Sequence, residues 1–252
     1  MNKLLVEKNE FYTIIKLNRP NVRNAIDPDI IKSLIEITKE TEQNTNQKGI
    51  IITSSEDKYF SSGGDLKYFL TLDNYEKGKK MSSEFNKIFE IWEKSSLLII
   101  AAIEGMVIGG GVEFALGCDI RVVGEKASFL FKQGKLGLIT GWGGTTRLKR
   151  SVSTGNALYI LTSGEKIYAT KAKELGFIEF ITPKGNSIKK SIEILSSLKD
   201  TYRESIIAYK EILYDQSLNS DKKSFIKERE LFAKLWDSPF HRKKEREFFK
   251  KN

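Results

Sequence analysis

The apolar run Leu97–Ile103 is the feature that most restricts the fold of this chain. It contains no charged residue, and it is far shorter than the roughly 20 residues that cross a bilayer. A continuous apolar strand of this length is typical of sheets that are covered on both faces. We therefore expect a layered α/β domain with this run inside it.

The segments around this run follow a repeating order of strand, strand and helix. The β-rich runs LLVEK and FYTIIKLN open the chain, and Asp27 with Pro28 marks the start of a helix with apolar residues at helical spacing. The run GIIIT is a further strand, and a second long helix is expected over roughly Asn74 to Glu93. This order predicts ββα units stacked into a spiral rather than a doubly wound sheet.

The last part of the chain has only helical patterns. From about Asn186 onward, one amphipathic stripe and three further helical segments follow, near Ser205–Tyr214, Lys222–Trp236 and Arg242–Lys250. We divide the chain into a spiral domain, residues 1–190, and a C-terminal helical region, residues 191–252. These helices have few ways to bury their apolar faces alone, so we expect them to pack on the main domain or on another subunit.

Composition limits the classes of protein that remain. The chain has 252 residues, 40% of them apolar, which is enough for a real core. Its opening lacks a secretory signal, and the single cysteine, Cys118, can form no internal disulfide and cannot anchor a zinc site alone. We expect a cytoplasmic protein without a metal. The formal charge of +9 is compatible with a polyanionic partner, which could be nucleic acid, a membrane surface or a phosphorylated cofactor, and equally with solvated helix faces. We expect no membrane partner.

Three glycine-rich loops hold the chemical signal: FSSGGDL (Phe60–Leu66), GGGVEF (Gly109–Phe114) and GWGGTTRL (Gly141–Leu148). Glycines at the end of a strand let backbone N–H groups turn toward a ligand without obstruction by a Cβ atom. Two such groups from separate loops can converge on one oxygen as an oxyanion hole. A dinucleotide site is excluded because no GxGxxG follows the first strand and opens a helix.

In this order and spacing the loops resemble the enoyl-CoA hydratase/isomerase (crotonase) family. The resemblance runs from LNRP-NVRNA through the three loops to TSGEKIYATKAKELGFIEFI, about three quarters of the chain. It implies a crotonase-like spiral of ββα units with a C-terminal helical region, assembled as a trimer or a dimer of trimers. It also implies an acyl-CoA thioester as substrate and no separate cofactor, because coenzyme A is part of that substrate.

The resemblance assigns roles residue by residue. The N–H groups of Gly64 and Gly110 hold the thioester carbonyl, and Glu113 matches one of the two catalytic glutamates of the hydratases. The acyl pocket is expected to include Leu138 and Trp142. The positions that match coenzyme A contacts are Asn21, Val22, Arg23, Ser62, Gly64, Asp65 and Leu66. We expect Asp65 mainly to fix the geometry of its loop.

The second catalytic glutamate of the hydratases is missing. Gln133 stands at its position, and an amide can orient a water but cannot exchange a proton as a general acid or base. Decarboxylation needs less, because loss of CO2 from a malonyl-type thioester leaves the enolate directly in the oxyanion hole. The loops also look like those of the ethylmalonyl-CoA decarboxylase branch. We favour decarboxylation of a methylmalonyl- or ethylmalonyl-type thioester, with hydration of a 2-enoyl-CoA, or isomerisation, as the alternative.

Two other classes stay open. One is a catalytically silent relative that binds an acyl thioester. The other is an RNA-binding protein that uses the basic tail, although the sequence has no RNP, helix-turn-helix or zinc-finger pattern. In that tail Phe248 and Lys251 match positions that contact coenzyme A in some hydratases. We expect Arg147 to pair with a carboxylate and Cys118 to be a buried core thiol.

Overall fold

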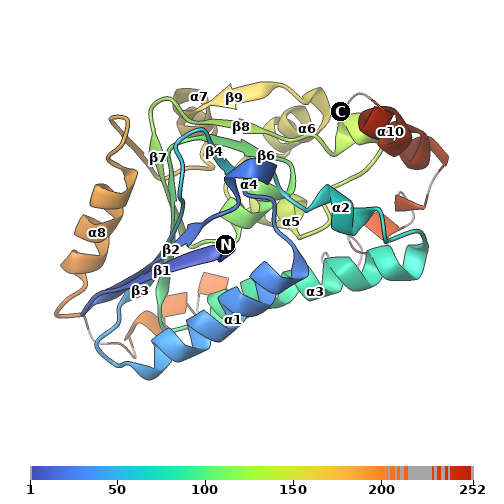
Figure 1. Ribbon diagram of the computed structural model, residues 1–252. Helices are drawn as coiled ribbons and strands as arrows, with labels where there is room; N and C mark the ends of the chain where they lie inside the picture. Colours follow the sequence, from blue (N-terminus) through green and yellow to red (C-terminus); the bar gives the residue numbers. More distant parts are fainter. Residues whose placement is uncertain are drawn as a thin grey trace.

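The larger of two β-sheets forms the centre of the molecule (Figure 1). The structure is a computed structural model that describes residues 2–201, 203, 205–207, 209–210, 213–214, 229, 232–233, 236–237 and 239–250. The strand order is β1-β2-β3-β5-β7-β10, and every neighbouring pair is parallel except β1 with β2. The strands are β1 Leu4–Lys8, β2 Tyr12–Leu17, β3 Gly49–Ser54, β5 Leu98–Ile103, β7 Ile120–Gly124 and β10 Phe180–Thr182.

The smaller sheet has the order β4-β6-β8-β9. Its strands are β4 Tyr59–Ser61, β6 Met106–Ile108, β8 Ser128–Leu130 and β9 Lys166–Tyr168. The strand pairs β3–β4, β5–β6 and β7–β8 are consecutive in sequence, and each pair places its first strand in the larger sheet and its second in the smaller one. The chain therefore advances by one strand in both sheets with each turn, which confirms the predicted spiral of ββα units.

Helices fill the turns of the spiral, and their starts follow local sequence signals. The Asp27 carboxylate accepts a hydrogen bond from Ile30 N and begins α1, and the Asn74 side chain caps α3 in the same way. The helices are η1 Pro20–Val22, α1 Pro28–Gln43, α2 Leu66–Phe69, α3 Tyr75–Lys94, α4 Gly110–Leu116, η2 Gly134–Leu136, α5 Gly144–Leu148, α6 Thr154–Ser163, α7 Ala169–Leu175, α8 Ser187–Ser197 and α10 Pro239–Lys250.

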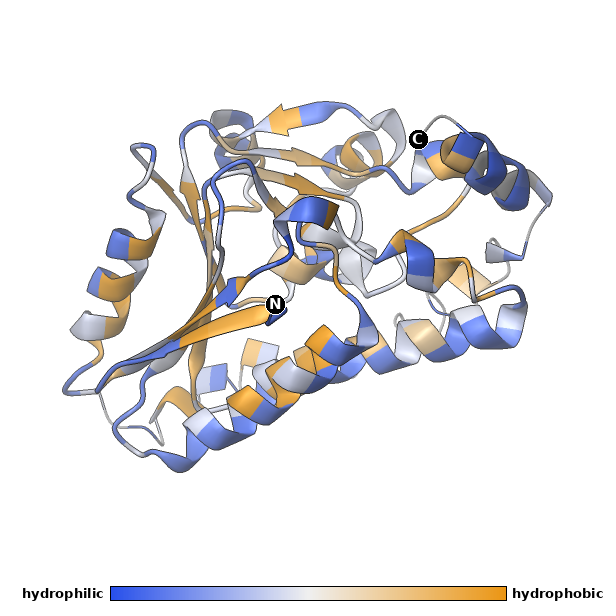
Figure 2. Ribbon diagram, viewed as in Figure 1, coloured by the Kyte–Doolittle hydropathy of each residue, from blue (hydrophilic) through white to orange (hydrophobic). Residues whose placement is uncertain are grey.

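The larger sheet is covered on both faces, as the run Leu97–Ile103 predicts. One face meets the main core, to which α1 and α3 contribute; the other face packs on α8 through a separate cluster that includes Ile51, Ile100 and Leu195. Figure 2 shows the apolar strands between helices with polar outer faces. In the main core, the side chains of Phe85, Ile88, Phe89 and Trp92 on α3 are buried.

The C-terminal part contacts the spiral domain through buried side chains. Lys210 Nζ lies 2.7 Å from Asp119 Oδ2 and donates to the carbonyls of Trp92 and Leu97 at 2.8 Å each. Helix α10 confirms the predicted helix near Arg242–Lys250, and the described residues of the predicted helix near Ser205–Tyr214 are helical. The predicted helix near Lys222–Trp236 falls largely outside the described residues. Helix α8 spans the predicted boundary at residue 190, and the division itself stays a prediction. No helix within the described residues has both the length and the apolar composition needed to cross a membrane.

Candidate active site

Two of the three glycine-rich loops touch each other. A Cβ atom built on Gly63 would lie 2.7 Å from Gly110 N and 3.0 Å from Gly110 Cα. The φ angle of Gly63 is +87°, a conformation that residues with a side chain rarely adopt. Glycine at position 63 is therefore needed both for the backbone turn and for the contact between the loops.

The two N–H groups at this contact are held by the bonds of their own peptides. Gly63 O accepts a hydrogen bond from Ile26 N at 2.7 Å, so the N–H of Gly64, on the opposite side of the same planar peptide, points away from Ile26. Gly109 O accepts from Val112 N at 3.0 Å, which directs the N–H of Gly110 out of the start of α4. The hydrogen bonds of the described residues include no acceptor for either N–H group. These two N–H groups are the ones that the sequence analysis assigned to an oxyanion hole.

The Glu113 carboxylate is buried among N–H donors. Its Oε2 accepts from Trp142 N at 2.6 Å and from Gly144 N at 3.0 Å. Its Oε1 accepts from Gln133 Nε2 at 2.8 Å and from Gly141 N at 3.3 Å. A carboxylate offers about four lone-pair positions, so these bonds occupy its acceptor capacity. Glu113 thus joins α4 to the third glycine-rich loop.

Gln133 faces Glu113, as the sequence predicted. Its Nε2 makes the bond described above, while its Oε1 is buried and accepts no hydrogen bond from the described residues. Leu138, the expected pocket residue, follows five residues later and is 8% exposed; its N–H donates to Gln133 O at 2.9 Å. The structure therefore brings the side chains of Glu113 and Gln133 together. The backbone hydrogen bond holds Leu138 close to Gln133.

Trp142 lies directly over Gly110. A Cβ atom on Gly110 would lie 2.7 Å from Trp142 Cζ3, and the indole stacks on Phe85 with 4.6 Å between ring centroids. Trp142 Nε1 donates to Met81 Sδ at 3.3 Å. The side chain is almost fully buried. Its position beside one candidate donor fits the wall of an acyl pocket.

The ring of Phe69 lies against the other glycine, Gly64, where it would overlap any added Cβ atom. Phe69 in turn meets the edge of Trp236 at 5.2 Å between centroids, and Trp236 Nε1 donates to Leu72 O. Sequence analysis did not single out Phe69. The available signal was its position five residues after the glycine, at the end of a short helix.

The two expected coenzyme A segments lie side by side. Ser62 N donates to Arg23 O at 2.9 Å, and Ser62 Oγ donates to Val22 O at 3.3 Å. Asn21, Val22 and Arg23 are exposed, as is Leu66, whereas Asp65 is buried and caps α2. These segments offer backbone and side-chain groups at the surface, next to Gly64.

The remaining predicted residues have structural surroundings. Arg147 lies 3.6 Å from Glu93 Oε1 through its Nε and donates to Trp142 O at 2.7 Å, which confirms the predicted carboxylate partner. Cys118 is buried, also as predicted. Phe248 is exposed on α10. The side chain of Lys251 lies outside the described residues, as does that of His241, the single histidine of the sequence, to which no role is assigned.

Comparison with known proteins places this chain in one family. A profile described as enoyl-CoA hydratase/isomerase matches residues 7–251. The short-chain-enoyl-CoA hydratase of Clostridium acetobutylicum is 30% identical over 79% of this chain and 74% of its own length. The human ethylmalonyl-CoA decarboxylase is 27% identical, over 90% of this chain and 74% of its own. The crystal structure of an enoyl-CoA hydratase from Bacillus anthracis superposes with a TM-score of 0.79 and 29% identity, covering 89% of this chain and 90% of that one. This chain therefore belongs to the enoyl-CoA hydratase/isomerase family.

Proposed function

We propose that this protein decarboxylates a malonyl-type thioester, of the methylmalonyl- or ethylmalonyl-CoA class, and stabilises the resulting enolate between Gly64 N–H and Gly110 N–H. One observation carries the choice of reaction: the acceptor positions of Glu113 are occupied by N–H donors, and its neighbour is the non-ionisable Gln133. Among the described residues, the proposed site offers N–H donors for an oxyanion and no pair of carboxylates for acid–base work.

The proposed reaction balances without a protein base. The Cα–carboxylate bond breaks, CO2 leaves, and the electron pair moves into the thioester to give an enolate oxygen. The two N–H groups stabilise that oxygen more strongly than the ground-state carbonyl because its charge is larger. Cα then takes one proton from water, and the acyl-CoA product is released.

Hydration of an enoyl-CoA would require Glu113 to act as a general base, which decarboxylation does not. A general base must accept a hydrogen bond from the attacking water before it takes the proton. Each lone-pair position on Glu113 would first have to lose one of the backbone or amide donors named above. The same donors offset the negative charge of Glu113, which lowers the cost of placing a second carboxylate, that of the substrate, nearby.

Charge and assembly complete the proposal. Coenzyme A carries phosphates, which the net charge of +9 attracts, so affinity for acetyl-CoA should weaken as salt rises. We further propose a homotrimer or a dimer of trimers that acts in the cytoplasm without a separate cofactor. Competition by short RNA at equal or lower concentration would favour the RNA-binding alternative instead.

Hydration of a 2-enoyl-CoA is the second candidate. Two observations favour it: the hydratase names among the relatives, and the buried Gln133 Oε1, which has an acceptor position for a water. In that reaction Glu113 would act alone as the proton carrier, and Glu113→Gln would abolish hydration.

Mass spectrometry separates the two candidates. The purified protein is incubated with methylmalonyl-, ethylmalonyl- and crotonyl-CoA, and each thioester is followed for loss of CO2 or gain of water. We expect loss of CO2 from a malonyl-type thioester. Brisk hydration of crotonyl-CoA with no decarboxylation would contradict the proposal, and binding without any turnover would support a silent relative.

Gln133→Glu is the diagnostic variant. A carboxylate at this position would lie where Gln133 Nε2 now approaches Glu113 Oε1 at 2.8 Å. Two carboxylates so close raise the pKa of one of them and disfavour a carboxylated substrate. We expect slower decarboxylation and, because a proton carrier is restored, some hydration of crotonyl-CoA.

A further inference from the structure

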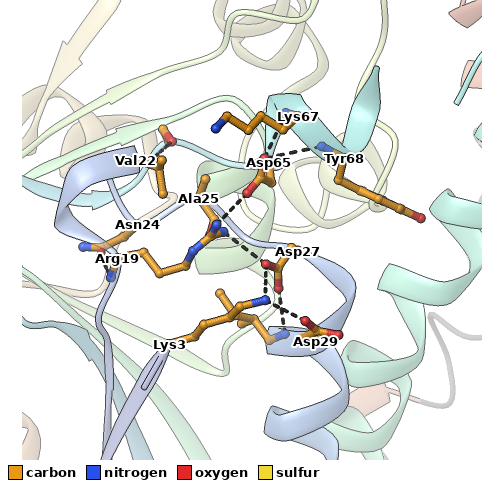
Figure 3. A network of polar contacts seen from close by, with 12 residues as sticks. Lys3, Arg19, Val22, Asn24, Ala25, Asp27, Asp29, Asp65, Lys67 and Tyr68 are labelled. Atoms are coloured by element: carbon orange, nitrogen blue, oxygen red, sulfur yellow. Dashed lines mark hydrogen bonds and ion pairs between the residues drawn. The ribbon is translucent and has the colours of Figure 1, made fainter. Parts of the chain in front are cut away.

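The guanidinium of Arg19 joins residues 25–27, which directly follow the candidate coenzyme A contacts Asn21–Arg23, to Asp65 in the second candidate segment (Figure 3). Its Nη2 lies 2.7 Å from Asp65 Oδ2, and its Nη1 lies 3.3 Å from Asp27 Oδ2. Nη1 also donates to Ala25 O at 2.8 Å. One planar group therefore contacts residues 25 and 27 on one segment and residue 65 on the other.

Each of the two aspartates begins a helix. Asp27 Oδ1 accepts from Ile30 N at 3.0 Å at the start of α1. Asp65 Oδ1 accepts from Lys67 N at 2.9 Å at the start of α2. Because each carboxylate uses one oxygen for its helix and the other for Arg19, the guanidinium fixes the start of α1 relative to the start of α2.

Two backbone hydrogen bonds connect the segments that Arg19 joins, and Gly64 lies between them. Ile26 N donates to Gly63 O at 2.7 Å, and Asp65 N donates to Ile26 O at 2.9 Å. A shift of residues 25–27 relative to residues 63–65 would rotate the Gly63–Gly64 peptide and, with it, the N–H of Gly64.

The charges favour the same arrangement. Burial raises the pKa of the Asp65 carboxyl, but the hydrogen bond and charge of Arg19, together with two backbone N–H groups, outweigh it, so the pKa lies below its ordinary value. Lys3 contacts Asp27 and Asp29 at 2.6 Å each but makes no contact with Asp65 among the described interactions. Arg19 is thus the cation at Asp65, and Lys3 is a matched cation that shares Asp27 only.

We propose that Arg19 is a positioning residue that aims the Gly64 N–H at the thioester carbonyl by tying Asp65 to residues 25–27. The inference rests on the proposed role of Gly64. Arg19 acts through the peptide of Gly64 and contacts no substrate atom. A misdirected donor costs catalysis while the coenzyme A contacts stay, so kcat should fall more than affinity.

Infrared difference spectroscopy tests this directly. Acetyl-CoA labelled with carbon-13 at its carbonyl is bound to the wild-type protein, to Arg19→Lys and to the control Lys3→Ala. We expect the carbonyl stretch to move to lower wavenumber in the wild type and in Lys3→Ala, and to move clearly less in Arg19→Lys. With the thioester that the wild type turns over, kcat of Arg19→Lys should fall about 10- to 100-fold while KM stays within about threefold.

The outcomes separate this inference from the proposed function. If wild-type protein binds acetyl-CoA without any carbonyl shift, the proposed donors are wrong. If the wild type shows the shift and folded Arg19→Lys keeps both the full shift and its kcat, only the inference about Arg19 is wrong. Should Arg19→Lys not fold, Asp65→Asn, which keeps an oxygen to cap α2, takes its place in the infrared test, with the same expected loss of the carbonyl shift. Lost stability with an unchanged shift would also overturn the inference.

Discussion

Asp65 and Glu113 are both buried carboxylates that closely follow a glycine with a free N–H group, yet their partners differ. Asp65 pairs with the guanidinium of Arg19, and Glu113 accepts bonds from uncharged amides of Gln133 and of the loop at residues 141–144. The adjacent positive charge of Arg19 therefore neutralises the negative charge of Asp65. The charge of Glu113 is solvated by dipoles but remains in the site.

Because their partners differ, we expect the two carboxylates to have different roles in their loops. At the Gly64 loop, an ion pair joins elements that are far apart in sequence, and the result is a fixed backbone. At the Gly110 loop, backbone amides hold a net negative charge beside the place where we expect the acyl group. The first arrangement is tested by stability and pH, and the second by chemistry.

Removal of the N–H group of Gly110 should have the largest effect. Gly110→Pro deletes the proposed donor at the first position of α4, where proline is tolerated, and we expect activity to fall on the order of 10²–10³-fold. Gly110→Ala is the matched control, because both variants bring a Cβ atom within 2.7 Å of Trp142 but alanine keeps the N–H. Turnover is measured alongside far-UV circular dichroism. A folded, fully active proline variant would show that the oxyanion hole lies elsewhere.

Substitution of each carboxylate by its amide should separate the two loops in stability. Glu113→Gln turns one acceptor oxygen into a donor that faces backbone N–H groups, and we expect a loss of about 3 kcal/mol in the free energy of unfolding. Asp65→Asn keeps an oxygen for the cap of α2 and leaves Arg19 its bonds to Asp27 and Ala25, so a loss of about 1–2 kcal/mol is expected. Urea denaturation measures both. Equal losses would mean that the hydrogen bonds of Glu113 stabilise the fold no more than the ion pair of Asp65 does.

Much of the fold follows from the sequence because its signals are local. The Asp27–Pro28 start of α1, the apolar strand β5 and the order of ββα units depend on residues close together in the chain, and all three predictions are confirmed. The facing pair Glu113 and Gln133 was predicted only through the family resemblance.

The surroundings of the site could not be predicted in the same way. The N–H donors to Glu113 come from about thirty residues further along, and the sequence does not record which loops converge. The ring of Phe69, at the end of α2, lies against Gly64, and no pattern in the sequence indicates this contact. Arg19 lies in the LNRP motif, but its two carboxylate partners are known only once the starts of α1 and α2 are placed in space.

Acid should remove the contribution of Asp65 to stability. Because its pKa is lowered in the folded protein from an ordinary 3.8, the pairing with Arg19 stabilises the fold fully above that value and is lost as pH falls through the folded pKa. The difference in unfolding free energy between the wild type and Asp65→Asn should be constant from about pH 7 to 5 and should shrink below about pH 4. A difference that persists at the acid end would mean that the carboxylate acts through its shape rather than its charge.

The smallest effect should appear at Cys118, which reports on the Gly110 side alone. Its thiol is buried two residues beyond the end of α4 and donates to Phe114 O at 3.7 Å, and burial raises its pKa, so it reacts only when this part of the chain opens. It is the single cysteine of the chain, so a colorimetric thiol reagent reads it without ambiguity. Glu113→Gln loosens the tie between α4 and residues 141–144 and should speed labelling of the native protein about tenfold, the effect of about 1.4 kcal/mol in local opening. Asp65→Asn acts on the other loop and should leave the rate within about twofold. If both variants accelerate labelling equally, the two loops open together, and the separation drawn between the ion pair and the amide cluster does not hold.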